Sequence, residues 1–492
     1  MADTEPTPDT RGLFFRVFPS ICLPMFMAAV DQTIVATALP AMAATLGDVE
    51  RVSWVVVAYL MATTIAAPVY GRLGDALGRK RMLFGALAVF IVASILCAIA
   101  PTLLTLVAAR VLQGFGGGGL MTLSQALVGE TVPPRERARY QGYLAAIFML
   151  SATLGPVVGG WLTQQFGWQS VFLVNLPLGA VAMVLAMRLP DWRPTPARLR
   201  FDWLGLLLFS GFVVPLLLAL EQAQRIAWPV VPGIATLVGL AILSLVLLLR
   251  QERRTRQPLI PINLLRMPAI WRADAMGACV GATIVSTVTF MPIYLTVVRG
   301  ADAGRAGLLM LPLTAGVAAG ALLTGRMIAR TGQTAVYPSY GLALVVGSLL
   351  VLAFGAAAIP TSWLPLVFLV LSMSLGTTMP VVQTTVQLVA GPKNLGAASA
   401  SVQFSRSIGA ALGTALVGAV LFAALSLRDG GVASVFAAVV ERGPSVMAAL
   451  SPDRRAAVTT EIAGAFSAAF GTIACFAAVG LVLAWTLPVR RL

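Results

Sequence analysis

The sequence contains no histidine, and only 11% of its 492 residues are charged. A chain without imidazole has no histidine proton relay or histidine metal site, so any proton carrier must be an aspartate or a glutamate. The four cysteines lie inside apolar runs and form no close pair, which indicates buried thiols rather than disulfides or metal ligands. A soluble domain has about 25% charged residues, so the low charge argues against a soluble protein.

Most of the sequence consists of long apolar runs. Hydrophobic residues make up 58% of the chain, and the mean hydropathy is +0.90. A membrane-spanning helix needs roughly 20 such residues in a row. The sequence therefore predicts an all-α polytopic membrane protein with fourteen spans, at residues 14–39, 52–71, 82–100, 103–128, 138–163, 170–189, 203–221, 229–249, 270–298, 306–328, 336–358, 363–389, 397–426 and 463–487.

The basic residues predict the orientation of the chain. The net charge is +15, and almost all of it comes from arginine, since only Lys80 and Lys393 are lysines. These residues gather in short loops such as 72–81, 135–139 and 250–256, which the positive-inside rule places in the cytoplasm. Both termini are then cytoplasmic. A basic nucleic-acid-binding protein would need a soluble domain with a basic face, and no such domain is predicted.

A weak internal repeat predicts the domain organisation. The loop 71–81 after the second span begins Gly-Arg, and the loop 325–332 after the tenth span does the same with a similarly placed glycine. We expect a six-helix bundle at residues 1–190, an inserted helix pair with cytoplasmic linkers at 191–268, and a second bundle at 269–492. Two parallel repeats imply a central binding site and alternating access. The outer segment at about 428–462 is too polar to span, although residues 432–440 could form a short helix.

Asp31 and Arg110 are charged residues deep inside spans 1 and 4. A carboxylate at the membrane centre costs roughly 2.5–3.5 kcal/mol on insertion scales, so it usually has a partner or a function. Asp31 lies nine residues before Pro40 and Arg110 nine residues after Pro101. Both are thus roughly 13 Å from the outer interface, at 1.5 Å per residue. Equal depth allows an ion pair, and the pair could serve either proton coupling or helix packing alone.

Other polar residues within the spans are secondary candidates. Gln113 is one turn from Arg110 and should share its face, and Gln32 follows Asp31, so both could line a substrate cavity. Among the remaining acids, Glu130 lies near the basic inner loops. Asp274 is the reserve candidate for a second proton or cation site.

Glycine motifs in spans 4 and 5 predict close helix packing rather than nucleotide binding. Gly155 and Gly159 give a small-residue spacing, with Pro156 as a kink and Gly160 beside them. The glycine run 116–119 has no following Gly-Lys-Ser/Thr, so it is not a phosphate loop. With no nucleotide-binding domain, metal cluster or nucleophile–base arrangement, we predict neither a cofactor nor an enzyme.

Taken together, these motifs resemble the major facilitator superfamily, and specifically its fourteen-span drug:proton antiporter branch. The loop 71–81 is similar to the family's loop 2–3 signature and is the most specific match. Asp31-Gln32-Thr33-Ile34-Val35 is similar to the span-1 signature of the branch, and Arg110 with Gln113-Gly114 to the span-4 signature. Gly155-Pro156 with Gly159-Gly160 resembles the span-5 antiporter signature, although Ser151 stands where that pattern usually starts with glycine.

The resemblance implies roles for these residues. Asp31 and Arg110 would couple protons to export. Asp75, Arg79 and Glu130, with Gly71 and Gly78 in the same loop signature, would form a cytoplasmic gate that latches the outward-open state.

The resemblance also implies a monomer in a bacterial inner membrane that exports lipophilic drugs, with a periplasmic adaptor as a candidate partner. The scarcity of membrane acids favours neutral, monocationic or anionic lipophiles over dications. Export of one metabolite, lipid or siderophore remains an alternative, as does a receptor that transports nothing.

Overall fold

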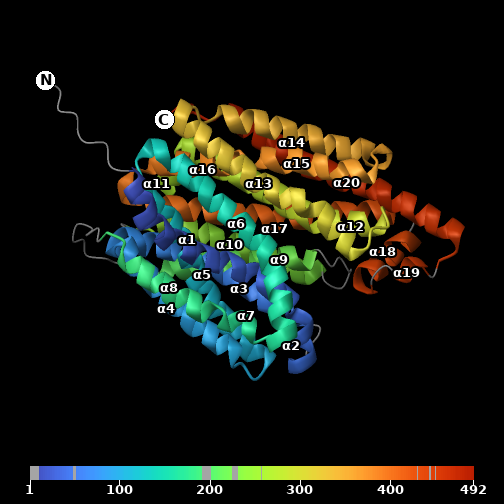
Figure 1. The fold of residues 1–492 in the computed structure, drawn as a ribbon, viewed down its shortest axis with the longest axis horizontal. Helices are drawn as coiled ribbons and strands as arrows, with labels where there is room; N and C mark the ends of the chain where they lie inside the picture. The colour runs from blue at the N-terminus through green and yellow to red at the C-terminus, as the bar shows by residue number, and fades with distance from the viewer. Residues whose placement is uncertain are drawn as a thin grey trace. The chain divides into compact units, whose positions relative to one another are not determined.

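The computed structural model describes residues 10–47, 51–190, 201–223, 231–255, 257–428, 430–442, 445–448 and 450–491 (Figure 1). The predicted linker residues 191–200 and the first two residues of the predicted span 229–249 lie outside this part of the chain. The α-helices are α1 Thr10–Ile34, α2 Leu39–Leu46, α3 Trp54–Leu77, α4 Arg79–Ala98, α5 Leu103–Thr131, α6 Pro134–Phe166, α7 Ser170–Leu173, α8 Asn175–Met187, α9 Trp203–Ala223, α10 Val231–Arg254, α11 Ile262–Leu265, α12 Pro268–Val297, α13 Ala303–Thr331, α14 Val336–Gly355, α15 Leu364–Gly376, α16 Thr378–Ala390, α17 Leu395–Arg428, α18 Gly430–Arg442, α19 Ser445–Ala448 and α20 Pro452–Trp485.

Fourteen helical segments of the described chain are long and apolar enough to cross a membrane, which confirms the predicted all-α polytopic fold. The largest shift of a boundary is at the last span, which begins at Pro452 rather than at residue 463. The expected short helix of the outer segment is present as α18. Its Phe436 packs against Phe422 and Phe466, so this helix is anchored by an aromatic cluster.

Glycines and polar caps set the helix ends. Gly78, Gly167 and Gly332 follow α3, α6 and α13 with φ values of 99°, 82° and 68°. L-residues with side chains rarely adopt such angles, so glycine ends these helices at little steric cost. At the start of α13, the Asp302 side chain accepts a hydrogen bond of 2.8 Å from the Arg305 backbone. Such a cap satisfies one of the unpaired N–H groups of a helix start.

Tryptophan side chains mark the ends of several spans. Large apolar side chains are exposed along many of the helices, as expected for surfaces that face lipid. Exposed tryptophans lie close to span ends, where their amphipathic rings suit the membrane–water interface. These residues are Trp54, Trp161, Trp203, Trp271, Trp363 and Trp485.

Contacts divide the chain into two compact units. The first comprises Met1–Ser210, Leu248–Ile262 and Gln387–Gln403, and the second comprises Gly211–Leu247, Asn263–Val386 and Phe404–Leu492. The bundle boundaries predicted at residues 190 and 268 stay a prediction, because this grouping follows contacts and divides several helices between the units.

The two units repeat one pattern of helix pairing. In the first unit, α3 and α4 pack on α5, and α8 packs on α1 and α4. In the second unit, α13 and α14 pack on α15, and α20 packs on α12 and α14; α14, α15 and α20 run side by side in Figure 1. Each pair recurs eight spans later, as the weak repeat in the loops suggests.

Glycines bring the paired helices close together. In the first unit, a Cβ on Gly116 of α5 would lie 2.8 Å from the backbone nitrogen of Phe90 and 3.0 Å from the carbonyl oxygen of Ala86, both in α4. In the second unit, Gly320 of α13 faces the backbone of Met373 in α15 in the same way. Small residues at such crossings allow the backbones to approach without loss of packing.

We expect Gly116→Ala to lower the apparent melting temperature of the purified protein by several degrees. The added methyl group meets backbone atoms that cannot move aside, and such overpacking costs about 1–3 kcal/mol. Gly85→Ala in α4 is the matched control, because a Cβ there would meet nothing within 4 Å. An unchanged melting temperature for Gly116→Ala would show that the α4–α5 contact can relax.

Candidate functional site

A buried ion pair lies in the first unit. Nη1 of Arg110, in α5, donates to Oδ2 of Asp31, in α1, at 2.5 Å, and both side chains are 0% exposed. Moving two such charges out of water is costly, so the pair persists only because each charge is satisfied by its neighbours. The two residues, which the residue count along the spans places at equal membrane depth, are thus in direct contact.

Three side chains donate to the Asp31 carboxylate. Besides Arg110, the amides of Gln113 in α5 and Asn175 in α8 donate to Oδ1 at 2.9 and 3.0 Å. Ser94 in α4 accepts from the same two amides at 2.9 and 3.3 Å, which fixes their orientation. The three donors thus satisfy the hydrogen-bonding capacity of this buried carboxyl group.

Aromatic rings enclose the guanidinium group of Arg110. Its Cζ lies 4.1 Å from the ring centroid of Tyr59 and 5.7 Å from that of Phe172. Nε donates to the Val55 carbonyl at 3.0 Å, and Nη1 also donates to Gln113 Oε1 at 2.7 Å. No described residue accepts a hydrogen bond from Nη2. A guanidinium stacked on ring faces is partly compensated by cation–π attraction, and this nitrogen is the least anchored part of the pair.

The structure separates the two glutamines that the sequence assigned to a substrate cavity. Gln113 is fully buried in the Asp31 network, where it contacts Arg110 and Ser94. Gln32 is half-buried and points elsewhere, with its amide 3.9 Å from the Met121 sulfur. Sequence reasoning missed Asn175, although an amide inside an apolar span was a usable signal.

The glycines of α6 that resemble the antiporter signature hold α1 immediately after Asp31. A Cβ on Gly155 would collide with the Thr33 side chain, and one on Gly159 would collide with backbone and side-chain atoms of α1 and the turn that follows. There α1 ends at Ile34 and continues as a 3₁₀ turn, Val35–Thr37. Gly160 faces open space and Pro156 is exposed, so only half of the motif makes this contact.

The predicted cytoplasmic gate residues are joined by ion pairs. Arg79, at the start of α4, contacts Asp75 of α3 at 2.5 Å and also contacts Glu130 of α5. The Asp75 carboxylate accepts hydrogen bonds of 2.8 and 3.0 Å from the backbone N–H groups of Gly396 and Ala397. These two groups belong to the first turn of α17, where the positive end of the helix dipole attracts an anion.

Two glycines make this ion-pair cluster compact. A Cβ on Gly71 would lie 2.6 Å from the Gly396 carbonyl oxygen, so α3 and the start of α17 touch through their backbones. Gly78 has a φ of 99°, and this residue turns the chain from α3 into α4. The turn places Arg79 within reach of Asp75, four residues earlier.

Asp274, the reserve acid, is buried in α12 of the second unit, where it is 5% exposed. Arg272, two residues before it, donates instead to the carbonyl oxygen of Thr486 at 2.5 Å. Among the described residues, no group of three or more His, Cys, Asp or Glu side chains could hold a metal ion.

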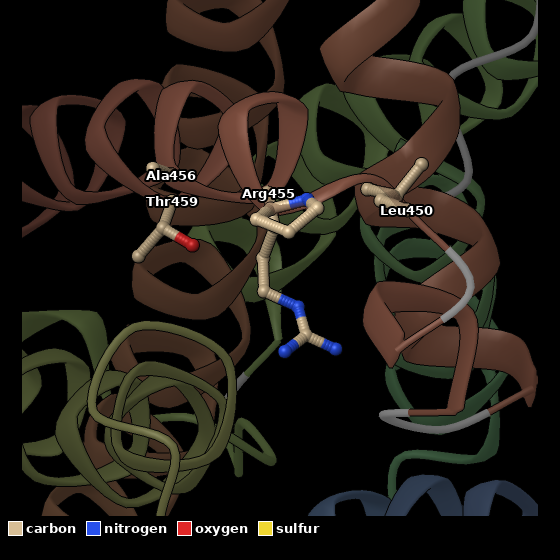
Figure 2. Close-up of a pocket in the computed structure, with 5 residues that line it drawn as sticks. Leu450, Arg455, Ala456 and Thr459 are labelled. Atoms are coloured by element: carbon tan, nitrogen blue, oxygen red, sulfur yellow. The ribbon is translucent and has the colours of Figure 1, made fainter.

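An open depression of about 590 Å³ lies beside the first turns of α20 in the second unit. Its lining includes Leu450, Pro452, Ala456 and Thr459, and Figure 2 shows the Arg455 side chain projecting into it. Arg455 Nε donates to the Met447 carbonyl at 2.8 Å, which joins α20 to α19. None of the site residues predicted from the sequence lines this depression.

Comparison with known proteins assigns the chain to a family. The Major Facilitator Superfamily model matches residues 21–414. An uncharacterised MFS-type transporter of Mycobacterium tuberculosis (strain ATCC 25618 / H37Rv) is 33% identical over 474 residues, covering 95% of this chain and 68% of the relative. The multidrug transporter protein MdtP of Bacillus subtilis (strain 168) is 29% identical over 408 residues, covering 82% of this chain and 74% of the relative.

A solved structure has the same fold. The human organic anion transporter MFSD10 aligns with a TM-score of 0.66 at 16% identity, covering 97% of this chain and 100% of that chain. The resemblance predicted from the sequence motifs, including the drug-efflux branch, is thereby confirmed. The protein is a multi-pass membrane transporter rather than an enzyme, and it belongs to the Major Facilitator Superfamily.

Proposed function

We propose that this transporter is a proton-coupled antiporter that exports lipophilic drugs or toxic compounds by alternating access. The observation that carries the proposal is the fully buried Asp31–Arg110 pair with its amide donors. A membrane-embedded carboxylate with a basic partner is the chemistry that proton relays in transporters use. The multidrug name of the Bacillus subtilis relative supports a lipophilic cargo.

The geometry supports one coupling scheme. In the described state, Asp31 is bound to Arg110 and shielded from solvent by α1, α3, α4, α5 and α8. Protonation removes the charge that holds Arg110, so Arg110 and the amides must reorganise. Substrate binding that favours one arrangement of this network then shifts the protonation equilibrium, and proton binding shifts the affinity for substrate by the same factor.

The cytoplasmic gate acts as the latch of the cycle. Asp75, Arg79 and Glu130 hold the start of α17 through charge and backbone hydrogen bonds. Breaking this cluster exposes several charges at once, so it opens as a unit. Asp274 is the reserve candidate for a site that binds a second proton or a cation.

The orientation and setting follow the loop charges. Basic residues crowd the loops assigned to the cytoplasm, which supports cytoplasmic termini in a bacterial inner membrane. We propose that the protein works as a monomer, with a periplasmic adaptor as its candidate partner.

Asp31→Asn should abolish proton movement driven by substrate. In liposomes with an imposed pH gradient, a lumenal pH dye reports proton flux as neutral, cationic and anionic lipophilic dyes are added. Wild-type protein should respond to at least one dye, whereas Asp31→Asn should bind the same dye with no flux above empty liposomes. Asp453→Asn, an exposed acid at the start of α20, is the matched control. Normal coupling in Asp31→Asn would make Asp31 a structural partner of Arg110 and direct attention to Asp274.

Asn175→Leu should lower substrate-driven proton flux several-fold at a fixed pH gradient. The variant removes one of the three donors that hold the Asp31 carboxyl group, and a hydrogen bond to a charged group contributes about 1.5–3 kcal/mol, so the coupling network is weakened. Asn263→Leu, at an exposed position in α11, should leave the flux unchanged. An unchanged flux for Asn175→Leu would remove Asn175 from the coupling network.

Asp75→Asn should loosen the start of α17. The substitution removes an ion pair and a helix-terminal charge, and the charge alone is worth about 0.3–2 kcal/mol. With the four native cysteines replaced by serine, a cysteine at the buried Ala398 position should react faster with a maleimide added to the cytoplasmic side. We expect an increase of about tenfold for a loss near 1.4 kcal/mol. Asp302→Asn, which caps α13 instead, should not change this rate.

A further inference from the structure

Two amides from different helices converge on one sulfur atom in the first unit. The Nε2 atoms of Gln32 in α1 and Gln403 in α17 lie 3.9 and 3.7 Å from Sδ of Met121 in α5. Gln403 and Met121 are 4% and 1% exposed, whereas Gln32 is half-buried and reachable. The three side chains therefore form a largely dry cluster with one accessible edge.

A thioether is a poor hydrogen-bond acceptor. Each of the two amides directs its Nε2 at Met121 Sδ, and a hydrogen bond to this sulfur is weak. An oxygen atom placed between them would accept both hydrogen bonds more strongly than the sulfur does. The cluster is thus chemically suited to a carbonyl or ether oxygen of a bound molecule.

One turn further along α5, two side-chain amide oxygens accept no hydrogen bond from any described residue. Gln125 lies four residues after Met121, on the same face and about 6 Å along the helix. Gln125 Oε1 and Gln387 Oε1 are buried, and no described residue donates to either of them. The N–H groups of Gln387 are already used, on the Gln125 carbonyl at 2.8 Å and on Ser399 Oγ at 3.2 Å. These two oxygens require a donor.

We propose that Gln32, Met121, Gln403, Gln125 and Gln387 form a substrate subsite for an uncharged lipophile. The ligand carries a carbonyl or ether oxygen and, about one helical turn away, a hydroxyl or N–H group. The oxygen takes the place of the Met121 sulfur between Gln32 and Gln403, and the donor binds Gln125 and Gln387. This assignment rests on the proposed export function, which it deepens by naming the cargo chemistry.

The test uses 4-hydroxybenzophenone, which carries both groups on a rigid apolar frame. Under ultraviolet light its carbonyl oxygen abstracts hydrogen from nearby C–H bonds, preferentially those of methionine, and the carbon then forms a covalent bond there. Full-length protein in lipid nanodiscs is irradiated with the probe, and mass spectrometry locates the adduct. We expect the adduct on Met121, because the reactive carbonyl takes the position of its sulfur and so lies next to the displaced methionine side chain.

Variants separate recognition from accidental proximity. Gln32→Leu and Gln403→Leu should each lower Met121 labelling roughly three- to tenfold, as expected for the loss of one hydrogen bond. Gln32→Asn, which keeps the amide but withdraws it by one methylene, should lower labelling with less risk to folding. Gln165→Leu, at an exposed position in α6, should leave labelling unchanged.

The second half of the subsite is tested by removing the hydroxyl from the probe. Unsubstituted benzophenone should label Met121 several-fold less than 4-hydroxybenzophenone, and Gln125→Leu should erase that difference. Absence of Met121 labelling, or labelling that Gln32→Leu, Gln32→Asn and Gln403→Leu all leave intact, would overturn the proposal. The readout requires no proton flux, so failure of the antiport mechanism at Asp31 would leave this result standing.

Discussion

The hydrocarbon interior of a membrane cannot solvate a charge, and this constraint governs the first unit of the transporter. Asp31 and Arg110 could remain charged there only if the protein supplied the solvation itself. It does so with the amides of Gln113 and Asn175 and with the ring of Tyr59. Several helices must keep their relative positions for this network to exist, so the charges also determine how α1, α5 and α8 pack.

The same logic distinguishes the two ends of the first unit. At the cluster of Asp75, Arg79 and Glu130, the Asp75 carboxylate is stabilised by Arg79 and by two backbone N–H groups at the start of α17, and these groups are buried. At Asp31, the donors are side chains buried with no access to solvent in the described state. The Asp75 cluster therefore depends on the position of one helix start, whereas the Asp31 network depends on side chains from α5 and α8.

Much of the fold could be predicted from the sequence, because span length and loop charge are nearly independent of tertiary structure. The Asp31–Arg110 contact was also accessible, since equal depth in two spans is a simple count along the chain. The position of a neutral side chain could not be predicted in this way. Gln32 and Gln113 both looked like cavity residues, yet rotation about their helices sends Gln113 into the ion-pair network and Gln32 toward Met121. The capping of α17 by Asp75 was equally hidden, because it joins residues more than 300 positions apart.

The 3₁₀ turn Val35–Thr37 has a mechanical consequence for the first span. The regular α-helical hydrogen bonds are interrupted there. The helix α1, which carries Asp31, and the helix α2 are therefore separate and are joined by a short 3₁₀ turn. The glycines of α6 press on this joint from one side. The loss of one ionic contact would tilt α1 slightly. The 3₁₀ turn can absorb this tilt while α2 stays in place.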